Sequence, residues 1–304
     1  MDEGQRARET LLAGLPLGDQ QLHLAGVSTA VLEGGSAADG PSLVLLHGPG
    51  EFGATWLPVL PRLVRTHHVV VPDLPGHGAS RVDDGRLDAG RVLGWLGELV
   101  ERTCPAPPVL VGKTVGGAVA ARFAAGNAHR LAALVLVDTL GLTAFDPDPR
   151  FGLAVHRFFA GPTPRSYERL MDLCTFDLDR VREAMGQRWD PFAAYAVQLA
   201  GDDQVQAALG SLIGQFAAAP IPPEVLAAID VPTTLVWGRH DLATPLSVAE
   251  EASARYGWPL HVVEDAGDDP GLDRPAAFVD VLKAALRAAL EAAPRAARRP
   301  EAVR

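Results

Sequence analysis

The chain has 304 residues, a hydrophobic content of 48% and a formal net charge of -10 at pH 7. This length and apolar content are enough to bury a sizeable core, in one large domain or in a domain with an insertion. Nucleic acids and anionic membrane surfaces both attract clustered positive charge, so the negative balance disfavours both as partners.

The first ten residues, MDEGQRARET, contain no apolar signal-peptide core, and no later run approaches the roughly 18 apolar residues that span a bilayer. We therefore expect a cytoplasmic protein without a membrane segment. The two cysteines, Cys104 and Cys174, are too few and too far apart in sequence to suggest a disulfide framework or a zinc site. No cluster of His, Cys, Asp and Glu has the spacing of a metal site, so no metal is expected.

After a polar N-terminal segment, residues 21–32 alternate around Ala25-Gly26, which predicts a β-hairpin. Short apolar runs then predict buried strands at 43–46, 69–71, 109–111, 134–138, 234–237 and 261–263. Continuous apolar strands separated by helical segments indicate an α/β protein with a mostly parallel, doubly wound sheet. Ligands of such sheets bind beyond the carboxyl ends of the strands.

The stretch from Pro107 to Ala125 predicts a strand, a sharp turn and a helix. Its centre, GKTVG at 112–116, fits the Gly-x-Ser-x-Gly nucleophile elbow, with Thr114 in place of Ser. The letters GKT also end a phosphate-binding P-loop, but that motif needs a glycine where this chain has Pro107. Neither a nucleotide nor any other cofactor is expected, because the Gly-rich loop at 48–53 also lacks the context of a dinucleotide site.

The segment 141–230 is much longer than the roughly dozen residues that a crossover connection needs. Its apolar residues recur at helical spacing, at positions 170, 173, 174 and 176, then 181, 185 and 189, then 192, 195 and 199. We interpret 141–230 as a helical cap inserted into a core made of 1–140 and 231–292, with helices packed elsewhere as the alternative. The Pro/Arg-rich tail, 293–304, is expected to be disordered.

Five motifs resemble those of the capped α/β-hydrolases, in the same order and at similar spacing. They are HGPGEFGATW at 47–56, DLPGHGAS at 73–80, the elbow at 112–117, WGRHD at 237–241 and DAGDDPGLDRPAAF at 265–278. The resemblance covers essentially the whole chain and implies this fold. It implies less about the reaction, because the superfamily includes esterases, lactonases, dehalogenases, epoxide hydrolases, C–C hydrolases, lyases and non-enzymatic receptors.

The resemblance places Thr114 at the nucleophile position, Asp241 at the acid position and Asp268 at the histidine position, with Asp269 as an open alternative for the last. A triad of this composition lacks the base that activates a hydroxyl at neutral pH. An aspartate, with a reference pKa near 3.9, is a poor base towards an alcohol. Elbow residues also have positive φ, which a β-branched Thr disfavours, so we do not expect Thr114 to act as a nucleophile.

The family's oxyanion hole takes one N–H from the residue after the nucleophile, here Val115, and another from the loop after the first core strand. In that loop Pro49 has no N–H, and Gly50 could replace it as the donor. With Gly50, the neighbouring Glu51 and Phe52 are candidate substrate-binding residues. We nevertheless favour a helix-capping role for Glu51, because carboxylates are stabilised at helix N-termini.

Three histidines lie in or beside these motifs. His47 is expected to bond backbone groups, and His77 is expected to be a loop residue. His240 could in principle replace the missing base. It lies next to Asp241, however, and adjacent strand residues point to opposite faces, so we expect it to face away from the site.

These features favour an enzyme that acts on a hydrophobic small molecule by acid/base chemistry, as in cyclisation, isomerisation, dehydration or lyase reactions. Asp241 and Asp268, if close together, would share a proton. Lys113, at the rim, would bias both towards ionisation and hold an anionic substrate. Two alternatives stay open, namely hydrolysis of an ester, lactone or related bond by carboxylate-activated water, and a catalytically inactive small-molecule binding protein. The sequence identifies neither the substrate nor the oligomeric state.

Overall fold

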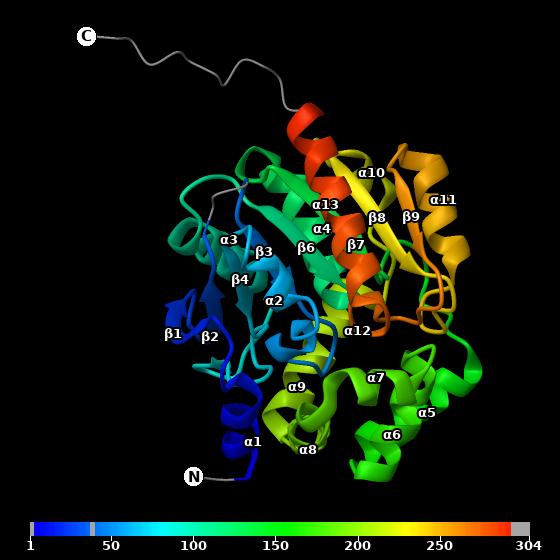
Figure 1. Cartoon of the computed structure of the whole chain (residues 1–304). Helices are drawn as coiled ribbons and strands as arrows, with labels where there is room; N and C mark the ends of the chain where they lie inside the picture. Colours follow the sequence, from blue (N-terminus) through cyan, green and yellow to red (C-terminus); the bar gives the residue numbers. More distant parts are fainter. Residues whose placement is uncertain (1–2, 37–39, 293–304) are drawn as a thin grey trace.

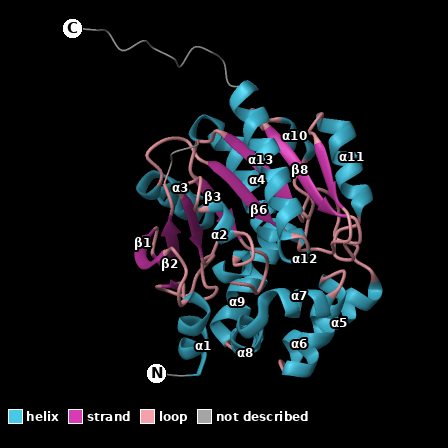
Figure 2. Ribbon diagram, viewed as in Figure 1, coloured by secondary structure: helices cyan, strands magenta, loops and turns pink. Residues whose placement is uncertain are grey.

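The computed structural model describes residues 3–36 and 40–292. Within these residues one nine-stranded sheet has the order β1-β2-β4-β3-β6-β7-β8-β9, with β5 paired to β2 (Figures 1 and 2). Strands β3, β4 and β6 to β9 are parallel, whereas the pairings that involve β1, β2 and β5 are antiparallel. The predicted fold class, a mostly parallel α/β sheet with an inserted helical region, is confirmed.

The buried strands coincide with the predicted apolar runs to within one or two residues, the hairpin strand β1 begins three residues before the predicted hairpin, and β5 is too short to show a pattern. The strands are β1 (Gly18–Leu24), β2 (Val27–Gly34), β3 (Leu43–Leu46), β4 (Val69–Pro72), β5 (Arg81–Val82), β6 (Val109–Lys113), β7 (Ala133–Val137), β8 (Thr233–Gly238) and β9 (Leu260–Val263). The hairpin of β1 and β2 turns at Ala25 and Gly26, whose φ angles are 46° and 74°. Two consecutive positive φ angles are typical of a tight hairpin turn.

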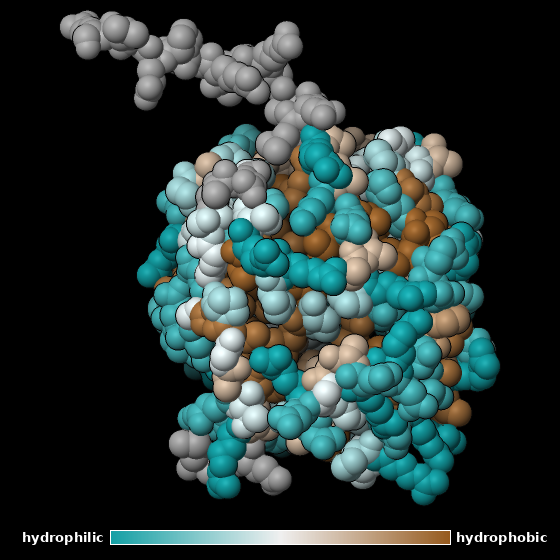
Figure 3. Space-filling view, viewed as in Figure 1, coloured by the Kyte–Doolittle hydropathy of each residue, from teal (hydrophilic) through white to brown (hydrophobic). Residues whose placement is uncertain are grey.

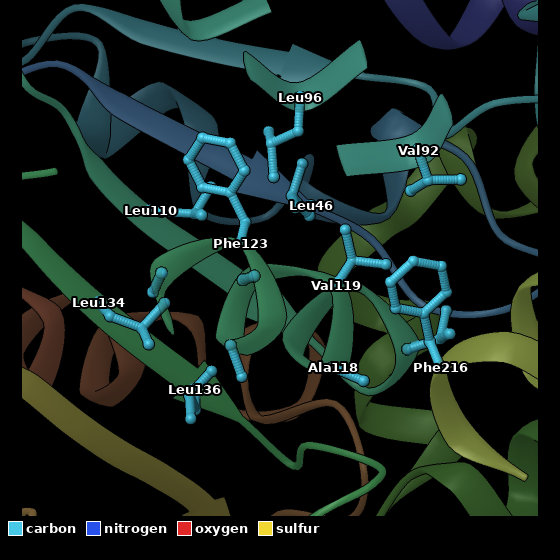
Figure 4. Close-up of a cluster of buried hydrophobic side chains, with 14 of the residues drawn as sticks. Leu46, Val92, Leu96, Leu110, Ala118, Val119, Phe123, Leu134, Leu136 and Phe216 are labelled. Atoms are coloured by element: carbon cyan, nitrogen blue, oxygen red, sulfur yellow. The ribbon is translucent and has the colours of Figure 1, made fainter. Parts of the chain in front are cut away.

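Helices cover both faces of the sheet. One face packs against α3 (Ala89–Thr103), α4 (Val115–Asn127) and α11 (Leu246–Tyr256), and the other packs against α2 (Leu60–Leu63) and α13 (Pro275–Ala292). Figure 4 shows the first of these layers, where Val119 and Phe123 of α4 lie against Leu46, Leu110 and Leu134 of the central strands. Helix α4 is thereby fixed, and its N-terminus meets the carboxyl end of β6.

The helices between β7 and β8 lie in two places. Helices α5 (Pro149–Ala160), α6 (Pro164–Cys174), α7 (Leu178–Met185) and α8 (Trp189–Ala200) form a layer beyond the carboxyl ends of the strands (Figure 1). This layer, which we call the cap, packs on the loops of the sheet through Phe52, Leu57 and Leu272. After α9 (Asp203–Leu212), a π-helical turn (Ile213–Ala217) and α10 (Pro223–Ala227) pack on α4 instead.

The N-terminal end of the chain differs from the prediction, and the predicted C-terminal tail lies outside the described residues. Residues predicted as a polar segment form α1 (Glu3–Leu12), which packs on α8 and buries Leu11. The segment has few apolar residues, so no helical period marks it. The predicted disorder of 293–304 falls outside the described residues. In the described part of the chain, no helix has the length and apolarity that a bilayer crossing requires.

Candidate functional site

Thr114 occupies a sharp turn between β6 and α4. Its backbone angles, φ 49° and ψ −113°, are those of a strained elbow. A Cβ atom on Gly112 would lie 2.5 Å from the carbonyl oxygen of Gly116, and one on Gly116 would lie 2.5 Å from that of His47. Small residues are therefore required on both sides of Thr114, as the motif predicted. The turn also keeps its positive φ although Thr114 is β-branched.

The hydroxyl of Thr114 is buried against the loop that follows β3. A Cβ atom built on Gly48 would lie 2.5 Å from Thr114 Oγ1, and among the described residues this oxygen has no hydrogen-bond partner. A hydroxyl becomes a nucleophile at neutral pH when a base accepts its proton. In the described part of the chain, no such base is bonded to the Thr114 hydroxyl.

One of the predicted oxyanion donors remains available at the elbow. Val115 is the first residue of α4, so its N–H has no acceptor within the helix. In the facing loop, the N–H of Gly48 already donates to Glu51 Oε2 at 2.8 Å. Gly50 has φ 71° and lies under the ring of Phe159 from α5, whose Cζ would be 2.6 Å from a Cβ at Gly50. The ring of Phe159 therefore lies directly over Gly50 in the loop that faces the elbow.

Lys113 is buried in an ion network and does not lie at a rim. It is 1% exposed, its Nζ lies 3.0 Å from Glu51 Oε2 and in closer contact with Asp269 Oδ2, and it faces the ring of Trp56. Burial favours the neutral amine, but the charges of Asp269 and Glu51 outweigh it and raise the pKa of Lys113. A buried charge requires paired partners, which explains why both carboxylates converge on this side chain.

Glu51 therefore has a different role from the predicted helix cap. The N–H of Gly53, which begins the short 3₁₀-helix Gly53–Trp56, donates to Asp73 at 2.6 Å and not to Glu51. Instead the carboxylate of Glu51 joins the backbone of Gly48 to Lys113. Burial raises the pKa of Glu51, and the positive charge of Lys113 partly offsets this.

Asp268 and Asp269 diverge, although they are adjacent. Asp269 is bound to Lys113 and also accepts a hydrogen bond from the N–H of Leu272 at 3.0 Å, at the start of α12 (Pro270–Asp273). Asp268 instead donates its N–H to the carbonyl of Cys174 in the cap at 3.0 Å, and its carboxyl contacts the thiol of Cys174. Asp268 is partly exposed as a residue, but its carboxyl is enclosed, and this burial raises its pKa well above the ordinary range. The negative charge of Asp241 raises it further, and Lys113 opposes the change.

A second buried carboxyl beside Asp241 belongs to Asp138, a residue that the sequence did not mark as a candidate. Asp241 accepts two backbone N–H groups of the turn that follows it, at 2.7 and 2.8 Å, and burial raises its pKa to about 7. Asp138 lies beside it and accepts the N–H of Gly238 at 2.9 Å, and among the described residues Asp138 Oδ2 and Asp241 Oδ2 are both buried without a hydrogen-bond partner. Burial and then the charge of Asp241 raise the pKa of Asp138 well above its ordinary range. The sequence suggested Asp241 and Asp268 as the close carboxyl pair, and in the structure the charge of Asp241 raises the pKa of both Asp138 and Asp268.

Asp138 carried a signal that sequence reasoning missed. It directly follows β7, at the carboxyl edge where ligands and functional side chains of parallel sheets gather. Its φ of 42° is also positive, as at Thr114, but this cannot be seen from the residue type.

The histidines lie as predicted. His47 is fully buried, bonds the carbonyl of the next residue at 2.8 Å through Nδ1, and accepts the N–H of Leu74 at 2.9 Å through Nε2. His77 is a buried loop residue bonded to a backbone carbonyl. His240 is exposed, with its ring 4.8 Å from that of Phe176. In the described ranges, no imidazole is bonded to the Thr114 hydroxyl.

Phe52 supports the cap. It is 3% exposed and its ring lies 5.3 Å from that of Phe192 and 4.7 Å from that of Tyr195. In this closed arrangement Phe52 joins the loop after β3 to α8. The described residues also contain no group of three or more His, Cys, Asp or Glu side chains arranged to hold a metal ion.

Comparison with known proteins places the chain in a family. Residues 43–281 match the model of the alpha/beta hydrolase family. The pimeloyl-[acyl-carrier protein] methyl ester esterase of Aeromonas hydrophila is 30% identical over 254 residues, which are 80% of this chain and 94% of that protein. A 2-hydroxy-6-oxononadienedioate/2-hydroxy-6-oxononatrienedioate hydrolase of Escherichia coli is 27% identical over 237 residues, covering 74% and 80%.

Solved structures show the same fold. A bacterial membrane phospholipase A superposes with a TM-score of 0.78 at 24% identity, covering 95% of this chain and 92% of that one. The 2-hydroxy-6-oxo-6-phenylhexa-2,4-dienoate hydrolase of Rhodococcus sp. strain RHA1 superposes with a TM-score of 0.77 at 22% identity, covering 89% and 99%. With the matching family model and the elbow geometry, these comparisons establish that the chain belongs to the alpha/beta hydrolase family.

Proposed function

We propose that this chain hydrolyses an ester or a related acyl bond of a small molecule, with water activated by Asp268 and no acyl-enzyme on Thr114. The observation that carries the proposal is the position of Asp268. Its enclosed carboxyl lies close enough to Lys113, the residue before Thr114, for their charges to act on each other. Thr114 itself has no bonded base in the described structure.

The raised pKa of Asp268 makes its carboxylate a better base than an ordinary aspartate. A general base works best when its pKa lies near the operating pH. In the proposed step, Asp268 takes a proton from water while the water oxygen bonds to the carbonyl carbon of the substrate. When the tetrahedral intermediate collapses, the bond to the leaving oxygen breaks and Asp268 returns the proton to that oxygen. The same carboxyl therefore acts as the base when it is ionised and as the acid when it is protonated.

The oxyanion formed in this step would lie at the N-terminus of α4. The free N–H of Val115 points from the first turn of that helix, and helix N-termini stabilise negative charge. The Thr114 hydroxyl, which lacks a partner, would hydrogen-bond the attacking water without forming a covalent bond. Lys113 acts indirectly, because its ion pairs fix the loop after β3 through Glu51 and the start of α12 through Asp269.

The relatives support hydrolysis over the other reactions considered. A methyl ester esterase and a 2-hydroxy-6-oxononadienedioate/2-hydroxy-6-oxononatrienedioate hydrolase are both similar to this chain over most of their length. The cyclase, isomerase, dehydratase or lyase hypothesis gains no such support from them.

The proposal is tested by comparing Thr114→Ala with Asp268→Asn on p-nitrophenyl esters of two to eight carbons and on the matching methyl esters. Asp268→Asn should lower kcat/KM by about 100-fold to 10,000-fold, the usual contribution of a general base. Thr114→Ala should keep kcat/KM within about tenfold of the wild type, since a lost hydrogen bond to water costs only about 1 kcal/mol. The control is Glu264→Gln, which changes an exposed carboxylate paired with Arg239.

A double variant separates the proposed mechanism from the family's usual one. Thr114→Ser with Asp268→His restores serine and histidine at the two positions, and should produce a burst of p-nitrophenol that the wild type lacks. A burst in the wild type that disappears in Thr114→Ala would refute the proposal. Saturable ester binding without any product would favour the non-catalytic alternative instead.

A further inference from the structure

Helices α5 and α6 form a groove on the cap that is separate from the elbow. It encloses a cavity of about 590 Å³, lined along α5 by Leu153 and Arg157 and along α6 by Arg165, Arg169 and Leu173. Glu51, Lys113, Thr114 and Asp268 are absent from its walls. Hydrophilic side chains gather over this part of the molecule, at the lower right of Figure 3, where α5 and α6 lie in Figure 1.

Three of the four arginines that line the groove form no ion pair with the described residues. A fourth arginine, Arg150, is paired with Asp148 at 3.1 Å. Arg157, Arg165 and Arg169 are exposed, and no carboxylate of the described residues forms an ion pair with any of them. Only Asp172 adds a negative charge to the lining.

The same groove has an apolar floor. Leu153 is 48% exposed, and the partly buried Leu173 and Ala154 lie in the lining beside it. A cavity of this volume is in the range that holds small molecules, with apolar walls and a few charged groups that fix the orientation. Guanidinium groups bind carboxylates and phosphates with paired hydrogen bonds.

We propose that the α5–α6 groove binds a single-chain anionic amphiphile, an alkyl carboxylate or alkyl phosphate, at a site distinct from Thr114. The headgroup would lie on Arg157, Arg165 and Arg169, and the alkyl chain would cover Leu153 and Leu173. A free amphiphile fits better than a bilayer for two reasons. The recess is concave, and the net charge of -10 on the whole chain repels an anionic membrane everywhere except at the arginines of the groove.

The test is calorimetric titration with dodecyl phosphate and dodecanoate, below the concentrations at which they form micelles. The wild type should bind one molecule per chain, and longer alkyl chains should bind more tightly. Replacing Arg157, Arg165 and Arg169 together by Gln should weaken binding at least tenfold. The matched control, Arg62→Gln with Arg65→Gln, removes exposed arginines elsewhere and should leave binding unchanged.

Leu153→Ser should weaken binding of the twelve-carbon chain more than that of an eight-carbon chain. Equal affinity for dodecanol, unchanged binding by the triple variant, or binding only to vesicles that contain phosphatidic acid would each overturn the proposal. The proposed hydrolysis is tested independently, because none of these variants touches Thr114 or Asp268.

Discussion

Replacing Lys113 by Met removes a buried cation that pairs with two carboxylates, the buried Asp269 and the partly exposed Glu51. Lys113 is 1% exposed, and its ammonium contacts Glu51 and Asp269. Met keeps most of the volume but leaves both acids without this partner. Removing one member of a buried ion pair typically costs about 3–5 kcal/mol, so we expect a loss of this order in the free energy of unfolding at pH 8.

The loss should be smaller at pH 5. Lys113 has a folded pKa above its ordinary value, so in the wild type its contribution is constant at every pH below about 10. In the variant, Glu51 keeps the raised pKa that burial imposes and no longer has the lysine that lowers it. A carboxyl with a raised folded pKa destabilises the protein as the pH rises from its unfolded pKa towards its folded one. Acidic conditions therefore let Glu51 become neutral and recover part of the loss.

Urea unfolding followed by tryptophan fluorescence at pH 5 and pH 8 measures both effects. The triple variant Lys113→Met, Glu51→Gln, Asp269→Asn should recover much of the stability at pH 8, because it leaves no buried charge in the network. A loss below about 1 kcal/mol in Lys113→Met, or an equal loss at both pH values, would refute the reasoning.

Two further variants test the elbow and the carboxyl pair. Burial raises the pKa of Asp241 to about 7, so ionisation of Asp241 beside Asp138 destabilises the fold as the pH rises from about 4 to 7. The Tm of Asp138→Asn minus the Tm of the wild type should therefore be larger at pH 8 than at pH 5. The same Tm difference at both pH values would contradict this. Gly116→Ala should lower the free energy of unfolding by at least about 3 kcal/mol, because its Cβ would lie 2.5 Å from the carbonyl oxygen of His47. Gly126→Ala, in the same helix but with open space around its Cβ, should instead stabilise the protein by about 0.5–1 kcal/mol. Equal effects of the two substitutions in chemical denaturation would show that the short distance between Gly116 and His47 is not the reason for a glycine at 116.

The sheet was predictable because its signals are local. Each buried strand is a continuous apolar run, and the glycines at 112 and 116 mark the tight contact of β6 with α4. Helix α1 was missed because it is stabilised by packing on α8, about 180 residues away, and not by its own pattern. The position of α10 beside α4 likewise depends on tertiary contacts that helical spacing does not encode.

The site was less predictable because its partners are distant in sequence. Lys113 meets Asp269, which lies 156 residues later, and Asp138 bonds the backbone of Gly238, which lies 100 residues later. The motifs identified the loops that converge, but the direction of each side chain follows from burial and charge pairing. The adjacent residues Asp268 and Asp269 therefore have different partners, and sequence spacing does not predict which of the two binds Lys113.

The central claim is that the chain hydrolyses an acyl bond without a covalent intermediate on Thr114. Intact-protein mass spectrometry after rapid acid quenching, during the first turnover of a p-nitrophenyl ester, tests it most directly. We predict p-nitrophenol release with only the unmodified 32.0 kDa chain present. A chain heavier by the mass of the acyl group, with the added mass located on Thr114, would contradict the claim.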